Sequence, residues 1–128
     1  MVTIGATTEL YFKLTLYECN HFKIHTQQPN FLTKLHNLEN AREGQRAHFE
    51  AKLEPMTDPH LQVEWLRNGE PIIIGHRFRP IHDFGYVALD IIDTISEDSG
   101  LYTCRATNLM GSCEIQAQLT CQGKTWSF

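Results

Sequence analysis

The sequence predicts an all-β sandwich of two antiparallel sheets. From about Pro29 onward, short runs of alternating apolar and polar residues are separated by turn residues, at a spacing of roughly 8–12 positions that is typical of sandwiches. No segment shows the sustained periodicity of an amphipathic helix. We therefore expect one domain over residues 29–122.

Two strands and an edge segment are expected in the first half of this domain. The odd positions of Ala47–Leu53 are apolar, and Leu61–Trp65 shows the same alternation. The second run stops at Asn68 and Gly69, a dipeptide typical of tight turns between antiparallel strands. Pro71 then begins an edge segment, because proline lacks the N–H that an interior strand must donate.

Three strands are expected in the second half. The stretch YVALDI, residues 86–91, sets apolar side chains inward at Val87, Leu89 and Ile91, with Ala88 and Asp90 outward. The last two strands are predicted at Leu101–Asn108 and Ser112–Cys121, joined at Gly111, which can take a positive φ. Odd positions of the final run, from Cys113 to Cys121, are apolar and its even positions are polar, a pattern typical of a half-buried antiparallel strand.

Residues 1–28 and 123–128 flank this domain. Leu10, Phe12, Leu14 and Leu16 alternate with more polar residues, which is strand-like, but no turn signal links them to a partner strand. We expect a weakly ordered extension; an extra strand, the end of a preceding module and a segment outside the working protein are the alternatives. Charged residues interrupt the apolar ones, so a signal peptide is not expected.

The composition narrows the class of partner. The formal net charge of −4 provides no basic surplus of the kind that nucleic-acid binding usually needs. No uninterrupted apolar run reaches the roughly 18–20 residues that span a bilayer. We therefore expect protein partners, and neither nucleic acid nor a membrane.

The four cysteines are Cys19, Cys104, Cys113 and Cys121. An even number in a small domain can indicate a disulfide framework, but three of them crowd into the last quarter of the chain and none has zinc-ligand spacing. We expect free thiols that act as small apolar side chains. Whether Cys113 or Cys121 forms a disulfide stays open.

Candidate catalytic and metal sites are weak. Of the seven histidines only His21 and His25 have a familiar short spacing, and it suits a helix that this segment does not otherwise suggest. The chain has no glycine-rich phosphate loop, and no motif places a serine, a histidine and an aspartate as a triad. We expect no metal, no cofactor and no enzymatic activity.

Trp65, Tyr102 and Cys104 carry a resemblance to the immunoglobulin sandwich. In that fold a strand tryptophan packs near a disulfide, and a tyrosine two residues before the second cysteine locks a turn; here an Asp-x-Gly turn, Asp98 to Gly100, precedes the tyrosine. More particularly, residues from about 29 to 122 resemble the intermediate-set (I-set) modules of giant muscle proteins of the titin and kettin kind. The stretches that carry this resemblance are LENAREGQRAHFEAKLEP, DPHLQVEWLRNGEPI, GHRFRPIHDFGYVALDI and EDSGLYTCRATNLMG.

The resemblance implies that Ala51 stands where the cysteine partner of Cys104 would lie. Cys104 would then be a buried thiol beside Trp65 and Ala51. A secreted domain commonly needs its disulfide for stability. In a reducing compartment such a bond would not persist, so its absence there costs little. We therefore expect a cytoplasmic protein of the sarcomere, in the Z-disc or I-band region.

The same resemblance implies roles for charged residues. Arg77 is expected to form a structural ion pair with Asp98. His76, Arg79 and His82 are candidates for contact with actin filaments, although exposed charges on an edge strand are often only solvated. We expect a structural and protein-binding module of a titin-like or kettin-like protein; an extracellular adhesion or receptor domain is the alternative.

Overall fold

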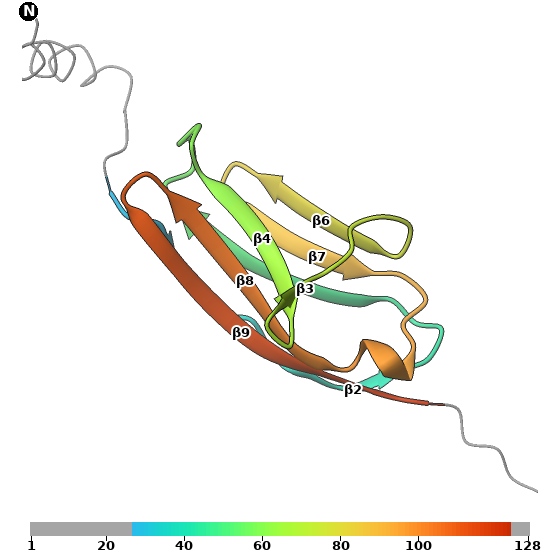
Figure 1. Cartoon of the computed structure of the whole chain (residues 1–128). Coiled ribbons are helices and arrows are strands. Elements are labelled where there is room, and N and C mark those ends of the chain that lie inside the picture. Colours follow the sequence, from blue (N-terminus) through green and yellow to red (C-terminus); the bar gives the residue numbers. More distant parts are fainter. Residues whose placement is uncertain (1–26, 124–128) are drawn as a thin grey trace, which may run out of the picture.

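The computed structural model describes residues 27–123 as two packed β-sheets (Figure 1). Residues 1–26 and 124–128, with Cys19, His21 and His25, lie outside the described range, and so do the expectations for the N-terminal extension and the tail. The strands are β1 Asn30–Phe31, β2 Leu38–Arg42, β3 Ala47–Glu54, β4 Gln62–Arg67, β5 Glu70–Pro71, β6 Phe78–Asp83, β7 Tyr86–Ile91, β8 Gly100–Asn108 and β9 Gly111–Gln122, with a short 3-10 turn at Ser96–Asp98.

The predicted all-β sandwich is confirmed, with one difference in strand direction. One sheet has the order β1-β3-β7-β6 and the other the order β2-β9-β8-β4-β5. All pairs are antiparallel except β2, which runs parallel to β9. The chain crosses between the sheets after Phe31, so β2 pairs with the last strand instead of with β3. This second sheet is therefore mixed.

The core lies between the sheets and follows the alternation of the strands. The odd positions of β3 are buried, from Ala47 to Leu53. In β9 the odd positions are buried or half-buried and the even positions are exposed. Cys113 is only half-buried, packed against the rim of the core. The hydrophobic effect of burying these apolar faces is the main force that holds the two sheets together.

Ala88 differs from the expectation of an exposed outward residue, because it is fully buried. β7 is an inner strand, and Ala88 is flanked across the sheet by Glu50 on β3 and Ile81 on β6. Longer side chains on both neighbouring strands therefore cover this small one. An alternation pattern indicates which face a residue takes, but not what its neighbours cover.

The turns take the conformations that their residues favour. Asn68 and Gly69 both have positive φ, 52° and 85°, which is the pair of values that a two-residue hairpin turn with matching twist requires. The Asn68 side chain also accepts a hydrogen bond from the Leu101 N–H at 2.9 Å. The turn between β4 and β5 is thereby tied to the start of β8.

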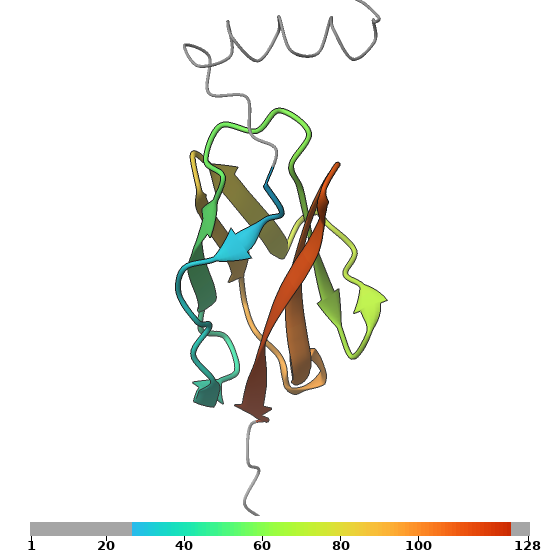
Figure 2. The ribbon, with the colours of Figure 1, turned by 90° about the vertical axis from the view of Figure 1, so that its left-hand side faces the viewer.

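The chain enters and leaves at opposite ends of the sandwich. Figures 1 and 2 show the coloured chain beginning at the end formed by the β3–β4, β6–β7 and β8–β9 connections and finishing at the other end, beyond β9. No helix among the described residues is long and apolar enough to cross a membrane.

We expect Gly85→Ala to destabilise the fold more than Gly44→Ala. Both glycines have a left-handed φ, +82° and +87°, so an alanine costs about 1–2 kcal/mol at either place. A Cβ at Gly85 would also lie 2.7 Å from the Leu53 carbonyl oxygen, whereas nothing lies within 4 Å at Gly44. Urea denaturation should show an additional loss of at least about 1 kcal/mol for Gly85→Ala; equal losses would contradict this packing.

Candidate functional site

The four residues expected in the structural core, Ala51, Trp65, Tyr102 and Cys104, belong to one buried cluster. Trp65 on β4 is the cross-strand partner of Cys104 on β8, and Ala51 lies on β3 of the opposite sheet. None is more than 3% exposed. Cys104 is a free thiol, so the sheets are held here by packing.

Burial lowers the reactivity of the Cys104 thiol toward groups outside the core. Removal from water raises the pKa of Cys104 to about 12, because the thiolate is poorly solvated in the core. Burial likewise raises the pKa of Cys113 and of Cys121, both of which are free thiols. Since the thiolate is the reactive form, none of these three described cysteines is activated as a nucleophile.

Phe49 completes this cluster, and the sequence motifs did not single it out. Its ring centroid lies 6.2 Å from that of Trp65 and 5.3 Å from that of Tyr102. Aromatic pairs at such separations contribute about 0.5–1.5 kcal/mol beyond the area that they bury. The odd position of Phe49 in its strand indicated an inward side chain but not which rings it would meet.

Asp98 connects three segments at the end where the chain leaves. Arg77 donates to its two carboxylate oxygens at 2.8 and 3.0 Å, and the Ile95 N–H donates at 2.9 Å. The hydroxyl of Tyr102 donates to the Asp98 carbonyl at 2.6 Å. Asp98 is only 2% exposed, so these bonds satisfy polar groups that burial would otherwise leave without partners.

The charge state of Asp98 depends on these donors. Burial alone would raise its pKa, but hydrogen bonds from Arg77 and from the Ile95 backbone outweigh burial and hold the pKa of Asp98 below its usual value. The stability from the ionised carboxylate is therefore present above the unfolded pKa of about 3.9. It is lost as the pH falls through the lower pKa of the folded state.

A second polar network covers the outer face of the four-stranded sheet, and sequence reasoning missed it. Arg46 donates to both carboxylate oxygens of Asp90 at 3.0 and 3.1 Å, and a ring nitrogen of His48 contacts the same carboxylate. The other ring nitrogen of His48 lies 2.9 Å from Glu50, which also accepts a hydrogen bond from Tyr86 at 2.8 Å. The alternation of each strand placed these residues outward, but only the register of β3 against β7 brings them together.

This network shifts the titration of His48. The hydrogen bond to Asp90, more than any other contact, raises the pKa of His48. Burial raises the pKa of Asp90, but the hydrogen bonds from His48 and Arg46 lower it by more, so the pKa of Asp90 lies below its usual value. Protonated His48 therefore stabilises the folded state at pH values below about 6.5, and this contribution is lost as the pH rises through the raised pKa.

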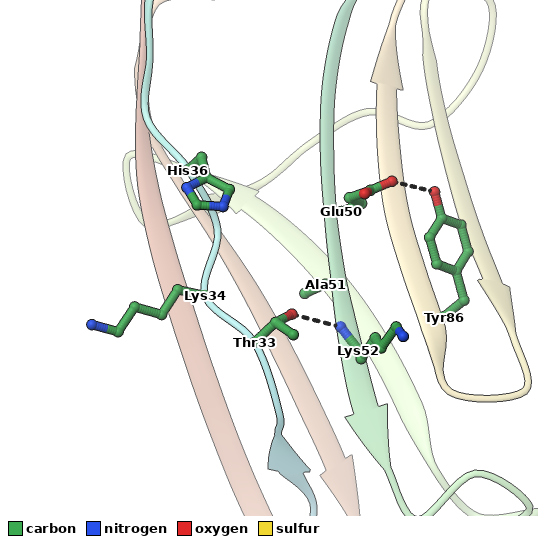
Figure 3. Close-up of a pocket in the computed structure, with 7 residues that line it drawn as sticks. All are labelled: Thr33, Lys34, His36, Glu50, Ala51, Lys52 and Tyr86. Carbon is green, nitrogen blue, oxygen red and sulfur yellow. Dashed lines mark hydrogen bonds between the residues drawn. The ribbon is translucent and has the colours of Figure 1, made fainter.

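A shallow groove of about 190 Å³ lies beside this network (Figure 3). β1 pairs with β3 only at Leu53 and Glu54, so Ala47–Ala51 has no strand partner on that side among the described residues. The Thr33 hydroxyl accepts a hydrogen bond from the Lys52 N–H at 2.9 Å (Figure 3). Figure 3 also shows the Lys34 side chain extending away from β3. The groove is lined by Thr33, Lys34, His36, Glu50, Ala51, Lys52 and Tyr86.

The structure does not gather the three candidate filament contacts into one patch. His76, Arg79 and His82 are all exposed, and Arg79 and His82 lie on β6, an edge strand. Arg79 pairs with Asp90 and His82 with Val87, so their side chains leave opposite faces of the strand. Between residues 27 and 123, no three histidine, cysteine, aspartate or glutamate side chains are grouped to hold a metal ion.

We expect Asp98→Asn to lower the free energy of unfolding by about 1–3 kcal/mol at neutral pH, because Arg77 loses a charged partner. The gap between the original protein and this variant should narrow as the pH falls from about 4 through the lower pKa of Asp98 in the folded state, where the carboxylate becomes protonated. Urea denaturation across this range measures both effects. Glu97→Gln, at an exposed neighbour, should change stability by less than about 0.5 kcal/mol; a gap for Asp98→Asn that does not depend on pH would contradict the ion pair.

We expect Ala51→Cys to form a disulfide with Cys104 under oxidising conditions. Both positions lie in one buried cluster on opposite sheets, and a bridge that closes a loop of this length adds about 2–4 kcal/mol relative to the reduced form. Peptide mass mapping and denaturation with and without reductant measure the result. The same change in a Cys104→Ala background is the control; a variant in which positions 51 and 104 stay unlinked would contradict the expected pairing.

Comparisons with known proteins agree with this architecture. The family model of the immunoglobulin I-set domain matches residues 29–121. Titin of Drosophila melanogaster is 65% identical to this chain over 95 residues. These residues make up 74% of this chain, but their share of the fly protein rounds to 0%. The muscle M-line assembly protein unc-89 of Caenorhabditis elegans is 32% identical over 117 residues, 91% of this chain and 1% of that protein.

Solved structures show the same relationship. The titin M3 domain, known from a crystal structure, has 37% sequence identity to this chain and a TM-score of 0.66. The match covers 73% of this chain and 96% of the M3 chain. Titin domain M7 has 29% sequence identity to this chain and a TM-score of 0.67, and the match covers 74% of this chain and 94% of the M7 chain. Since the family model covers more than half of the chain, this protein belongs to the immunoglobulin I-set family and resembles the immunoglobulin modules of titin.

Proposed function

We propose that this chain is a structural and protein-binding module of a titin-like muscle protein in the sarcomere. The observation that carries the proposal is the 65% identity to fly titin across 95 residues, 74% of this chain. The buried free thiol of Cys104 is compatible with the reducing cytoplasm that we propose as its compartment. An extracellular adhesion or receptor domain remains the alternative proposal.

The strand arrangement supports a mechanical role. The two ends of the domain lie at opposite ends of the sandwich (Figure 1), so a pull on the chain acts roughly along the strands. The first strand, β1, has only two paired residues. The next strand, β2, runs parallel to the last one, with Ala41 and Arg42 paired to Cys121 and Gln122. Tension would therefore load the β2–β9 hydrogen bonds in shear, where several bonds must break together.

The open side of β3 is the protein-binding surface that we propose for this module. On the side away from β7, Ala47–Ala51 presents backbone donors and acceptors beside the groove of Figure 3. An extended segment of a partner could pair with such an edge through its main chain, and side-chain pockets would then select the sequence. The groove is lined by two lysines, Lys34 and Lys52, and by one carboxylate, Glu50, and this excess of positive charge favours a segment with acidic residues.

Actin is the filament partner that we propose, in the Z-disc or I-band region. His76, Arg79 and His82 are exposed along the edge strand β6 and the loop before it. Because Arg79 and His82 point from opposite faces, a filament would have to contact the edge of the sheet and not one flat face. Such contacts are electrostatic and weaken with salt.

We expect the purified domain to sediment with actin filaments at low salt and less at about 0.15 M. Replacing His76, Arg79 and His82 by alanine should reduce the bound fraction, because the basic edge is removed. Arg105→Gln is the control, since Arg105 lies on the other sheet between Glu64 and Glu114. If the original domain fails to pellet at either salt concentration, actin is not its partner.

A further inference from the structure

Exposed apolar side chains gather at the end of the sandwich where the chain enters. Met56 in the β3–β4 loop is 56% exposed, Phe84 in the β6–β7 turn 74%, and Leu109 and Met110 in the β8–β9 turn 78% and 55%. Figures 1 and 2 show these three connections together at one end. We call Met56, Phe84, Leu109 and Met110 the apolar end surface. Its residues contribute little to the core, and apolar groups gathered in this way are typical of interaction sites.

The apolar end surface is held in shape by bonds between its loops. The Asn108 side-chain amide donates to the carboxylate of Asp58 at 2.9 Å, which joins the β8–β9 turn to the β3–β4 loop. The Met110 N–H donates to the Asn108 side-chain oxygen at 2.8 Å. On the other sheet, a Cβ at Gly85 would lie 2.7 Å from the Met56 side chain, so the β6–β7 turn and Met56 are in close contact. A partner would therefore meet a largely preformed surface.

The preceding chain is anchored beside this surface. Asn108 donates a hydrogen bond to the Gln27 carbonyl at 2.7 Å, and the Gln28 side chain donates to the Ser112 carbonyl at 2.9 Å. The described chain therefore begins beside the apolar end surface. Because n residues span at most about 3.3–3.6 Å × n, the nine residue steps from Gln27 back to residue 18 keep that residue within about 30–32 Å of the anchor, which gives the residues just before it a high effective concentration near these side chains.

The tethered residues have the composition of an occupant for an apolar surface. The stretch TELYFKLTLYE, residues 8–18, carries Leu10, Phe12, Leu14 and Leu16 and has only three charged side chains. The match to unc-89 covers 91% of this chain, so it extends into the residues before 28 and is not confined to the sandwich. We propose that residues 8–18 dock on the apolar end surface and extend the module beyond its two sheets.

The native cysteines allow a direct test in the full chain. A nitroxide label on Cys19, one residue beyond the proposed occupant, is introduced in a Cys113→Ser background, because Cys104 and Cys121 are buried. Docking should broaden the amide resonances of Met56 in the β3–β4 loop and of Phe84 in the β6–β7 turn, and this broadening should depend on the exposed apolar side chains. Without docking, the label would broaden resonances around Gln28 and Ser112, and any broadening at Met56 and Phe84 would not depend on those side chains.

Matched variants separate docking on this surface from other causes. Phe84→Ser combined with Leu109→Ser should restore most of the lost intensity at Met56, whereas Ile73→Ser combined with Ile74→Ser should not. Ile73 and Ile74 are also exposed, 87% and 56%, but lie in the β5–β6 connection. The broadening should stay the same on tenfold dilution. Broadening that falls on dilution would identify a second copy as the occupant. Broadening at Met56 and Phe84 that is absent, or that persists when Phe84 and Leu109 are replaced by serine, would show that residues 8–18 do not dock on this surface. Any of these results overturns the proposal.

Discussion

The buried carboxylate of Asp98 is the interaction on which much of the fold depends. It accepts hydrogen bonds from Arg77, which comes just before β6, and from the backbone of Ile95, while its own carbonyl accepts the hydroxyl of Tyr102 on β8. One residue thus links the two sheets at the end where the chain leaves. A buried charge is costly unless it is paired and hydrogen-bonded, so these partners act as a unit.

Packing, in place of a covalent bridge, holds the sheets together at their centre. Ala51 and the free thiol of Cys104 lie in the same buried cluster as Trp65, Tyr102 and Phe49. The indole N–H of Trp65 has no hydrogen-bond partner among the described residues, so this ring contributes through its contacts alone. A core of this kind stays the same in reducing and oxidising surroundings, which suits a module proposed to bear load in the cytoplasm.

The sandwich leaves different kinds of surface in different places. Where β2 crosses to the other sheet, the side of β3 stays open beside a polar groove. Where the loops meet at the opposite end from Asp98, apolar side chains are exposed beside the anchored Gln27 and Gln28. The first surface presents backbone groups that can pair with an extended partner, and the second presents apolar area. The two proposed contacts therefore use different physical forces and can operate at the same time.

The sequence by itself determined the class of fold, because alternation and turn residues act locally. It was sufficient for the strands around Phe49, Trp65 and Tyr102, for the Asn68-Gly69 turn and for the inward parity of β9. Only the tertiary structure decided the parallel pairing of β2 with β9, the burial of Ala88 and the joining of His48, Glu50 and Asp90 into one network. These features depend on which strands become neighbours and in what register, and such long-range pairing leaves no periodic signal along a single strand.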